Sequence, residues 1–185
     1  MPVYAYAILA AGWVAWMTPF LLRVFKRSTG RPASLDRRAR WGMPAIAVAY
    51  ALAWQGSFWT RSPGAWRIVI SSLLFVAASI LSWTSTRALG RQWRLDAGLS
   101  TDHQLVRSGP YSAVRHPIYS SMFCALLGTG LVLATPLSLL LPAILLLAVG
   151  TEIRVRVEDK LLASRFGDQF LEYRRRVPAY IPFLK

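Results

Sequence analysis

The sequence predicts an all-α integral-membrane protein with five transmembrane helices, a cytoplasmic amphipathic C-terminal helix and no Rossmann domain. Of its 185 residues, 55% are hydrophobic, and the mean hydropathy is +0.38, which is more apolar than a typical soluble domain. A helix needs about 20 residues to cross a bilayer. Five apolar stretches approach that length, namely residues 3–22, 43–59, 68–83, 118–134 and 137–153.

The first three stretches make up an N-terminal part, residues 1–86. No basic segment precedes the first stretch, so we expect it to remain a membrane span rather than to act as a cleaved signal peptide. The first two stretches carry no chemical motif. Tryptophans gather near the ends of the stretches, as is typical of a membrane interface: Trp41, Trp54, Trp59, Trp66, Trp83 and Trp93.

The last two stretches are joined only by Thr135 and Pro136. So short a link predicts an antiparallel helical hairpin. Within its first helix, Gly128 and Gly130 are expected to permit close helix packing rather than to bind phosphate. The chain has neither a P-loop nor a G-x-G-x-x-G after a strand, which excludes a soluble nucleotide-binding domain.

The basic residues predict the orientation. The chain has 22 Lys and Arg against 8 Asp and Glu, a net charge of +14. With five crossings, all the basic residues except Arg61 and Arg67 fall on one side of the membrane. The positive-inside rule then puts the N-terminus outside and the C-terminus in the cytoplasm. In so apolar a chain, this charge favours membrane lipids as partners and not nucleic acid.

The tail, residues 152–176, is predicted to continue the fifth span as an amphipathic helix in the cytoplasm. Gly167 is a point where this helix can break into two, and Val177-Pro178 should end it. The apolar residues recur at helical spacing between charged ones: Leu161, Leu162, Phe166, Phe170 and Tyr173.

The most informative run is Gly-Pro-Tyr-Ser-Ala-Val-Arg-His-Pro-Ile-Tyr, residues 109–119. It places Arg115 and His116 where a polar loop re-enters apolar sequence, followed by Pro117 at a position suited to the first turn of a helix. Ionisable residues at a membrane helix are costly and point to function. The spans themselves carry almost no charge, which disfavours an ion or proton relay through the bilayer.

A site is therefore expected at the cytoplasmic mouth, between residues 87–119 and 152–176. Arg154 and Glu158 lie four apart and share one face of a helix. The chain's two histidines, His103 and His116, have no cysteine pair or carboxylate cluster near them, so we predict no metal site. The single cysteine, Cys124, is expected to be a packing residue.

Two blocks of sequence resemble the integral-membrane isoprenylcysteine carboxyl methyltransferases, whose wider kin include phospholipid N-methyltransferases. The resemblance covers about residues 87–185, so we interpret 1–185 as a single methyltransferase domain with its catalytic part at 87–185. The first block is His103-Gln104-Leu105-Val106, Ser108-Gly109-Pro110-Tyr111 and Val114-Arg115-His116-Pro117-Ile118-Tyr119. The second is Arg154, Glu158-Asp159, Phe166-Gly167, Tyr173, Arg176-Val177-Pro178 and Pro182-Phe183.

The resemblance implies S-adenosylmethionine as the methyl donor. It implies that Arg154 faces the methyl acceptor and that Glu158 faces the cofactor. Asp159 departs from the family pattern, in which a second glutamate is usual. Asp96 stands where related enzymes can carry a cofactor-binding amide, and we leave it out of the site. The remaining cofactor-pocket residues implied are His103, Gln104, Leu105, Val106, Tyr111, His116, Pro117, Ile118 and Tyr119.

The expected activity is methyl transfer to an apolar or lipid-like acceptor, with carboxyl O-methylation of a prenylcysteine-like substrate as the leading reaction. A carboxylate is already ionised at neutral pH, needs no base, and could be held by Arg154 through a bidentate fork. Phospholipid amine N-methylation and thiol S-methylation are the alternatives, and Glu158 would then be the nearest base. An alternative of another class is a non-catalytic membrane scaffold or transporter subunit.

Overall fold

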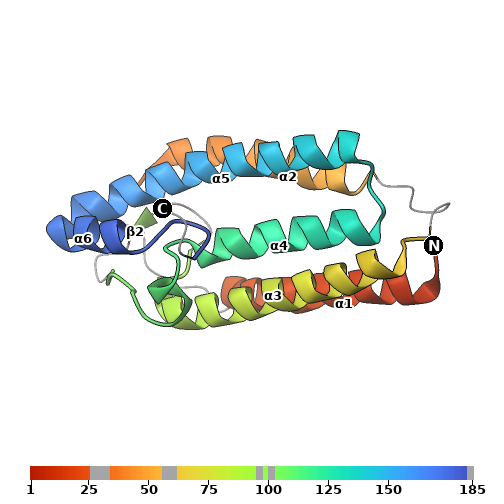
Figure 1. The fold of residues 1–185 in the computed structure, drawn as a ribbon. Helices are drawn as coiled ribbons and strands as arrows, with labels where there is room; N and C mark the ends of the chain where they lie inside the picture. Colours follow the sequence, from red (N-terminus) through yellow and green to blue (C-terminus); the bar gives the residue numbers. More distant parts are fainter. Residues whose placement is uncertain (26–33, 56–61, 95–97, 100–102, 183–185) are drawn as a thin grey trace.

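A computed structural model describes residues 1–25, 34–55, 62–94, 98–99 and 103–182 of the chain. In these ranges the protein is a bundle of α-helices with short 3₁₀ turns and one small β-ladder (Figure 1). The helices are α1 (Val3–Phe25), α2 (Gly42–Ala53), α3 (Ala65–Leu89), α4 (Pro117–Val132), α5 (Leu137–Phe166) and α6 (Asp168–Arg176), with 3₁₀ turns η1 (Arg37–Trp41), η2 (Gly90–Gln92) and η3 (Gly109–Ser112) and strands β1 (Ser34–Leu35) and β2 (Gly98–Leu99).

Helices α1 to α5 lie along a common axis and alternate in direction (Figure 1). The N-terminus lies at one end of the bundle, and α6 lies at the opposite end. This confirms the predicted all-α membrane fold, and the antiparallel order of the last two long helices is as the short Thr135-Pro136 link predicts.

Three helices in the described ranges are long and apolar enough to cross a membrane, namely α1, α3 and α5. Helices α4, with 16 residues, and α2, with 12, are shorter than a typical span. The second predicted stretch extends to Trp59, which lies outside the described residues. The five-crossing topology therefore stays a prediction.

The helices of the hairpin find their main packing partners elsewhere. Helix α4 packs chiefly against α3, and α5 packs chiefly against α2. At the first contact, a Cβ on Gly128 would lie 3.3 Å from the Phe75 ring, and Ser71 Oγ donates a 2.8 Å hydrogen bond to the Gly128 carbonyl. A Cβ on Gly130 would collide with Leu140. The prediction that these two glycines serve helix packing is confirmed.

Side-chain hydrogen bonds join the helices where little water is available to compete. Trp13 Nε1 donates to Thr129 Oγ1 at 3.1 Å, and Tyr50 donates to the Met122 carbonyl at 2.9 Å. Thr135 Oγ1 donates to the carbonyl of Ala53 at 2.6 Å. Such bonds satisfy polar groups that would be costly to leave unpaired in an apolar interior.

The end of the bundle that carries α6 is built from less regular structure. Strands β1 and β2 pair antiparallel, Ser34 with Leu99 and Leu35 with Gly98, and so tie the segment after α1 to the loop after α3. Helix α5 continues to Phe166, and Gly167, with φ of 50°, ends it before α6 begins. Glycine adopts that left-handed conformation without strain. The predicted break at Gly167 is confirmed.

Candidate active site

A cavity of about 340 Å³ lies at the α6 end of the bundle. Its size is in the range of small-molecule sites. Its walls come from α1, α2, the loop between α3 and α4, α4 itself, α5 and α6. Ten of the predicted site residues line it: His103, Gln104, Leu105, Val106, Tyr111, His116, Ile118, Tyr119, Arg154 and Glu158.

Pro117 has a different place. It is the first residue of α4 and is fully buried there. Its missing N–H costs nothing at that position, because the first N–H groups of a helix have no intrahelical acceptor. Pro117 therefore directs the start of α4, which carries Ile118 and Tyr119 into the cavity wall.

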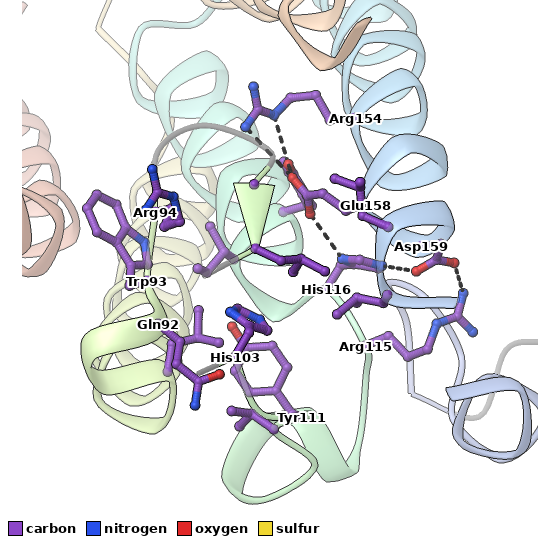
Figure 2. A pocket seen from close by; sticks show the side chains of 18 of the residues that line it. Gln92, Trp93, Arg94, His103, Tyr111, Arg115, His116, Arg154, Glu158 and Asp159 are labelled. Carbon is purple, nitrogen blue, oxygen red and sulfur yellow. Dashed lines mark hydrogen bonds and ion pairs between the residues drawn. The ribbon is translucent and has the colours of Figure 1, made fainter. Parts of the chain in front are cut away.

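Two adjacent carboxylates on α5 share His116 as a neighbour and differ in their other partners (Figure 2). Glu158 Oε1 accepts a 2.5 Å hydrogen bond from the Tyr119 hydroxyl. Asp159 is bound by Nη2 of Arg115 at 3.1 Å and by Nε2 of His116 at 2.9 Å. The His116 ring lies between the two acids, with Nδ1 3.6 Å from Glu158 Oε2. The side chain of Glu158 is 26% exposed and that of Asp159 only 9%, so Glu158 is the carboxylate accessible to a ligand.

Arg154 lies one helical turn before Glu158, as the spacing predicts. Its Nη2 is 3.7 Å from Glu158 Oε1, and its Nε donates to the Tyr119 hydroxyl at 2.8 Å. Only 10% of its side chain is exposed. A guanidinium buried to this degree needs nearby acceptors and charges to offset its desolvation. Tyr119 therefore fixes Arg154 and Glu158 relative to each other.

The segment 177–180, which we call the strap, holds the start of α4 in place through hydrogen bonds. The backbone N–H groups of Arg115 and His116 donate to the carbonyls of Pro178 and Ala179 at 2.8 and 2.9 Å. Ser120 Oγ donates to the Tyr180 carbonyl at 2.6 Å. These bonds join the chain just before and within the first turn of α4 to a segment some 60 residues later, and they fix the backbone that carries His116.

Tyr111 and Tyr173 close the cavity beside α6. The Tyr173 hydroxyl donates to the Tyr111 carbonyl at 2.6 Å. Burial raises the pKa of Tyr173 to about 12, against an opposing effect of the Arg115 charge. Burial also raises the pKa of Tyr111, with a further contribution from the Glu158 charge. Both phenols thus stay protonated at neutral pH, and Tyr173 remains a donor.

The wall of the cavity opposite α5 is formed by the first part of the loop after α3 (Figure 2). The Gln104 N–H donates to Gln92 Oε1 at 3.1 Å, which joins the start of this loop to its middle. The Trp93 ring packs 6.1 Å from that of Phe20 on α1. Asp96 lies outside the described residues. Sequence reasoning placed the loop at the site but missed several of its wall residues, among them Gln92, Trp93 and Arg94.

Sequence reasoning also missed an apolar part of the wall. It comes from α1, α2 and α4, where no motif marks it. Met17, Met43 and Met122 belong to this part, and their wide separation in the chain gives no sign that they line one cavity. As for metal, no group of three or more His, Cys, Asp or Glu that could hold an ion occurs within the ranges that the structure describes.

Comparison with known proteins adds to this geometry. The sequence model described as phospholipid methyltransferase matches residues 66–169. The cobalt-zinc-cadmium resistance protein CzcN of Cupriavidus metallidurans is 35% identical over 167 residues, which cover 85% of this chain and 73% of that protein. The protein-S-isoprenylcysteine O-methyltransferase of Saccharomyces cerevisiae is 40% identical over 84 residues, covering 45% of this chain and 35% of the yeast enzyme.

A solved structure has the same fold. The eukaryotic intramembrane Ras methyltransferase ICMT, isoprenylcysteine carboxyl methyltransferase, superposes with a TM-score of 0.57 at 22% sequence identity. The superposition covers 99% of this chain and 54% of that one. The present chain thus spans about half the length of the solved enzyme.

Fold, cavity and relatives together define an integral-membrane methyltransferase. The chain belongs to the phospholipid methyltransferase family, and isoprenylcysteine carboxyl methyltransferases are among its relatives, as the two sequence blocks predict. This membership favours an enzyme over the non-catalytic scaffold or transporter subunit. A methyltransferase of this family requires a methyl donor, which is generally S-adenosylmethionine.

Proposed function

We propose that the protein transfers a methyl group from S-adenosylmethionine to an apolar or lipid-like acceptor, and that the acceptor group is the carboxylate of a prenylcysteine-like molecule. One observation carries the proposal. Tyr119 from the first sequence block and Arg154 and Glu158 from the second meet at one cavity through hydrogen bonds of 2.5 and 2.8 Å. A structural role alone does not require two such blocks to converge on a cavity.

The residues present fit the cofactor. S-adenosylmethionine supplies a methyl group activated by a positively charged sulfonium, next to an amino-acid end and an adenine. Glu158, partly exposed in the cavity, can hold the cationic end. Leu105, Val106 and Ile118 offer apolar surface for the adenine. His116, Tyr111 and His103 complete this side of the wall.

Arg154 is proposed to hold the acceptor carboxylate. Its guanidinium lies 3.7 Å from Glu158, so an anion bound to Arg154 would lie beside the cofactor-binding acid. The bond from Arg154 Nε to Tyr119 restrains the planar fork in one orientation. Methyl transfer is a displacement, and holding two reactants in line supplies a large part of the rate. A carboxylate acceptor needs no proton removed, so the site needs no separate base.

The cavity is proposed to open to the cytoplasm, with the N-terminus outside. Basic side chains are concentrated at the end of the bundle that holds the cavity. They include Arg37, Arg38 and Arg40 in η1 and Arg174, Arg175 and Arg176 at the end of α6. This distribution agrees with the positive-inside rule. The water-soluble cofactor would then enter from the cytoplasm, and the acceptor from the lipid.

The proposal is tested in two stages on detergent-purified protein. Calorimetry with S-adenosylhomocysteine should show binding at micromolar to millimolar concentration, and no binding would contradict the enzyme reading. Transfer of labelled methyl is then measured onto N-acetyl-S-farnesylcysteine, phosphatidylethanolamine and an alkyl thiol. Base-stable label on the amine or the thiol, with none as base-labile ester, would replace carboxyl methylation by N- or S-methylation.

A further inference from the structure

The cavity has an apolar wall in addition to the polar one formed by residues 103–119 and 154–159. It is made by the side chains of Trp16, Met17, Phe20, Met43, Ile46 and Met122. The polar residues lie within the segment 66–169 that the family model matches. All of the apolar wall except Met122 comes from α1 and α2, which precede that segment. The two walls therefore differ in chemistry. They also differ in that the polar wall lies inside the segment matched by the family model, whereas most of the apolar wall lies outside it.

The apolar wall begins next to Arg154. Helix α2 starts at Gly42, where a Cβ would lie 2.9 Å from Cγ of Arg154. Met43 is the next residue, and Ile46 follows one turn later on α2. Ile46 also approaches Gly150, where a Cβ would lie 2.8 Å from Ile46 Cγ1. The wall contributed by α2 is thus continuous with the residue proposed to hold the acceptor's charge.

A second contact joins the wall to Tyr119. Met122 lies three residues after Tyr119 on α4, on the same face of the helix. Next to it, Ser121 Oγ accepts a 3.0 Å hydrogen bond from Trp16 Nε1 on α1. The Trp16 ring in turn packs edge-on to Phe20, with centroids 5.8 Å apart. This chain of contacts fixes the aromatic part of the wall against α4.

Methionine is unusually concentrated here. Of the four methionines in the sequence, Met17, Met43 and Met122 line this cavity. Methionine is unbranched and polarisable, and it adapts to ligands of different shape. Met43 is 44% exposed and so marks the outer edge of the cavity. The cavity measures about 340 Å³ in all and must also take the cofactor, so it can enclose only the near part of a long acceptor chain.

We propose that this wall is the acceptor-specificity element of the enzyme. It binds the apolar chain next to the methylated carboxylate, and it accepts acyclic chains of different length and branching rather than one rigid group. This inference rests on the proposed function and assigns its substrate selectivity to α1 and α2. Arg154 would recognise the carboxylate that all acceptors share. The three methionines would contact the apolar chain, in which the acceptors differ.

The test compares N-acetylcysteines carrying S-butyl, S-geranyl and S-farnesyl groups. Met43→Trp narrows the outer edge, and Met17→Ala enlarges the wall. With Met43→Trp, KM for the farnesyl acceptor should rise about tenfold or more while KM for the butyl acceptor changes little, since pocket fit discriminates at this level. Met17→Ala should shift the preference towards the bulkier acceptors. Leu21→Trp, on an outward-facing part of α1, is the matched control and should leave the profile unchanged.

Affinity for S-adenosylhomocysteine, measured by calorimetry, should stay within about twofold in all variants. An unchanged chain-length profile in both wall variants, with cofactor binding retained, overturns this inference but leaves the proposed function intact. If the wild-type protein does not bind S-adenosylhomocysteine, the proposed function itself is contradicted. If Met43→Trp does not fold, Met43→Phe takes its place. If the wild type methylates none of the three acceptors, their binding is followed by tryptophan fluorescence, and no dependence on chain length overturns the inference.

Discussion

Nε2 of His116 lies 2.9 Å from Oδ1 of Asp159, although the two residues are 43 positions apart in the chain. This contact joins the start of α4 to the C-terminal third of the long helix α5. Asp159 is also bound by Arg115, the residue before His116, at 3.1 Å. One buried carboxylate thus anchors two consecutive residues of the other sequence block, and the neighbouring Glu158 is left to face the cavity.

Replacement of Asp159 by Ala should destabilise the protein. It removes the partner of a buried Arg115, and an uncompensated buried charge costs about 3–5 kcal/mol. The melting temperature in detergent measures the loss. The control is Glu172→Ala, which breaks an exposed ion pair with Arg176 and should cost under about 1 kcal/mol. Equal effects of the two substitutions would show that the Asp159 contacts contribute little.

Arg154→Ala should abolish methyl transfer and leave the affinity for S-adenosylhomocysteine mostly intact. The reason is that Arg154 is assigned to the acceptor and not to the cofactor. Arg154→Lys keeps the charge but loses the planar fork, so it should restore only part of the activity. Turnover and calorimetry are measured on the same preparations. A fall in cofactor affinity as large as the fall in turnover would contradict the assignment of Arg154 to acceptor binding.

Tyr119→Phe deletes the hydroxyl that touches both Arg154 and Glu158. The ring and its packing are kept, so the fold should persist. A buried hydrogen-bonding group left without its partner costs about 1–3 kcal/mol, and both charged side chains lose a restraint on their orientation. We expect kcat to fall about tenfold or more, by loss of alignment. Ser72→Ala, which removes a hydroxyl that donates to the Ile68 carbonyl within α3, is the matched control and should leave kcat unchanged.

Gly42→Ala should weaken the contact between α2 and α5. A Cβ at this position would collide with the Gly150 carbonyl and press on the stem of Arg154. Overpacking of this kind typically costs about 1–3 kcal/mol, and here it should also reduce activity because Arg154 is displaced. Gly64→Ala is the control, since the nearest neighbour of its Cβ is the Trp66 side chain at 3.5 Å. A variant at Gly42 as stable and active as the control would contradict the close packing.

The features predicted correctly are those with a local physical cause. Gly167 ends α5 because it adopts a left-handed conformation, and Arg154 and Glu158 share a face because helical geometry places them there. The resemblance of two sequence blocks pointed to residues that do line one cavity. Of the eleven predicted site residues, ten line the cavity, and Pro117 is instead buried at the start of α4.

The features missed depend on long-range contacts that leave no periodic signal. Nothing in the sequence indicates that the backbone of Arg115 and His116 pairs with residues 178–179, or that β1 pairs with β2. The short link predicts the antiparallel order of α4 and α5 but not their packing partners, and α4 packs mainly on α3 and α5 on α2. Which faces meet is decided by small residues such as Gly128 and Gly42, whose partners lie far away in the chain.

The strap formed by residues 177–180 has a consequence for biosynthesis. Backbone bonds from this segment fix Arg115 and His116, so the cavity wall cannot reach its final form while these late residues are still held in the ribosome. The earlier helices can enter the bilayer first, and we expect the cavity wall to be completed only when residues 177–180 have left the ribosome. We therefore expect a newly made chain to become competent for methyl transfer only once its C-terminal segment is complete, after the earlier helices have been made.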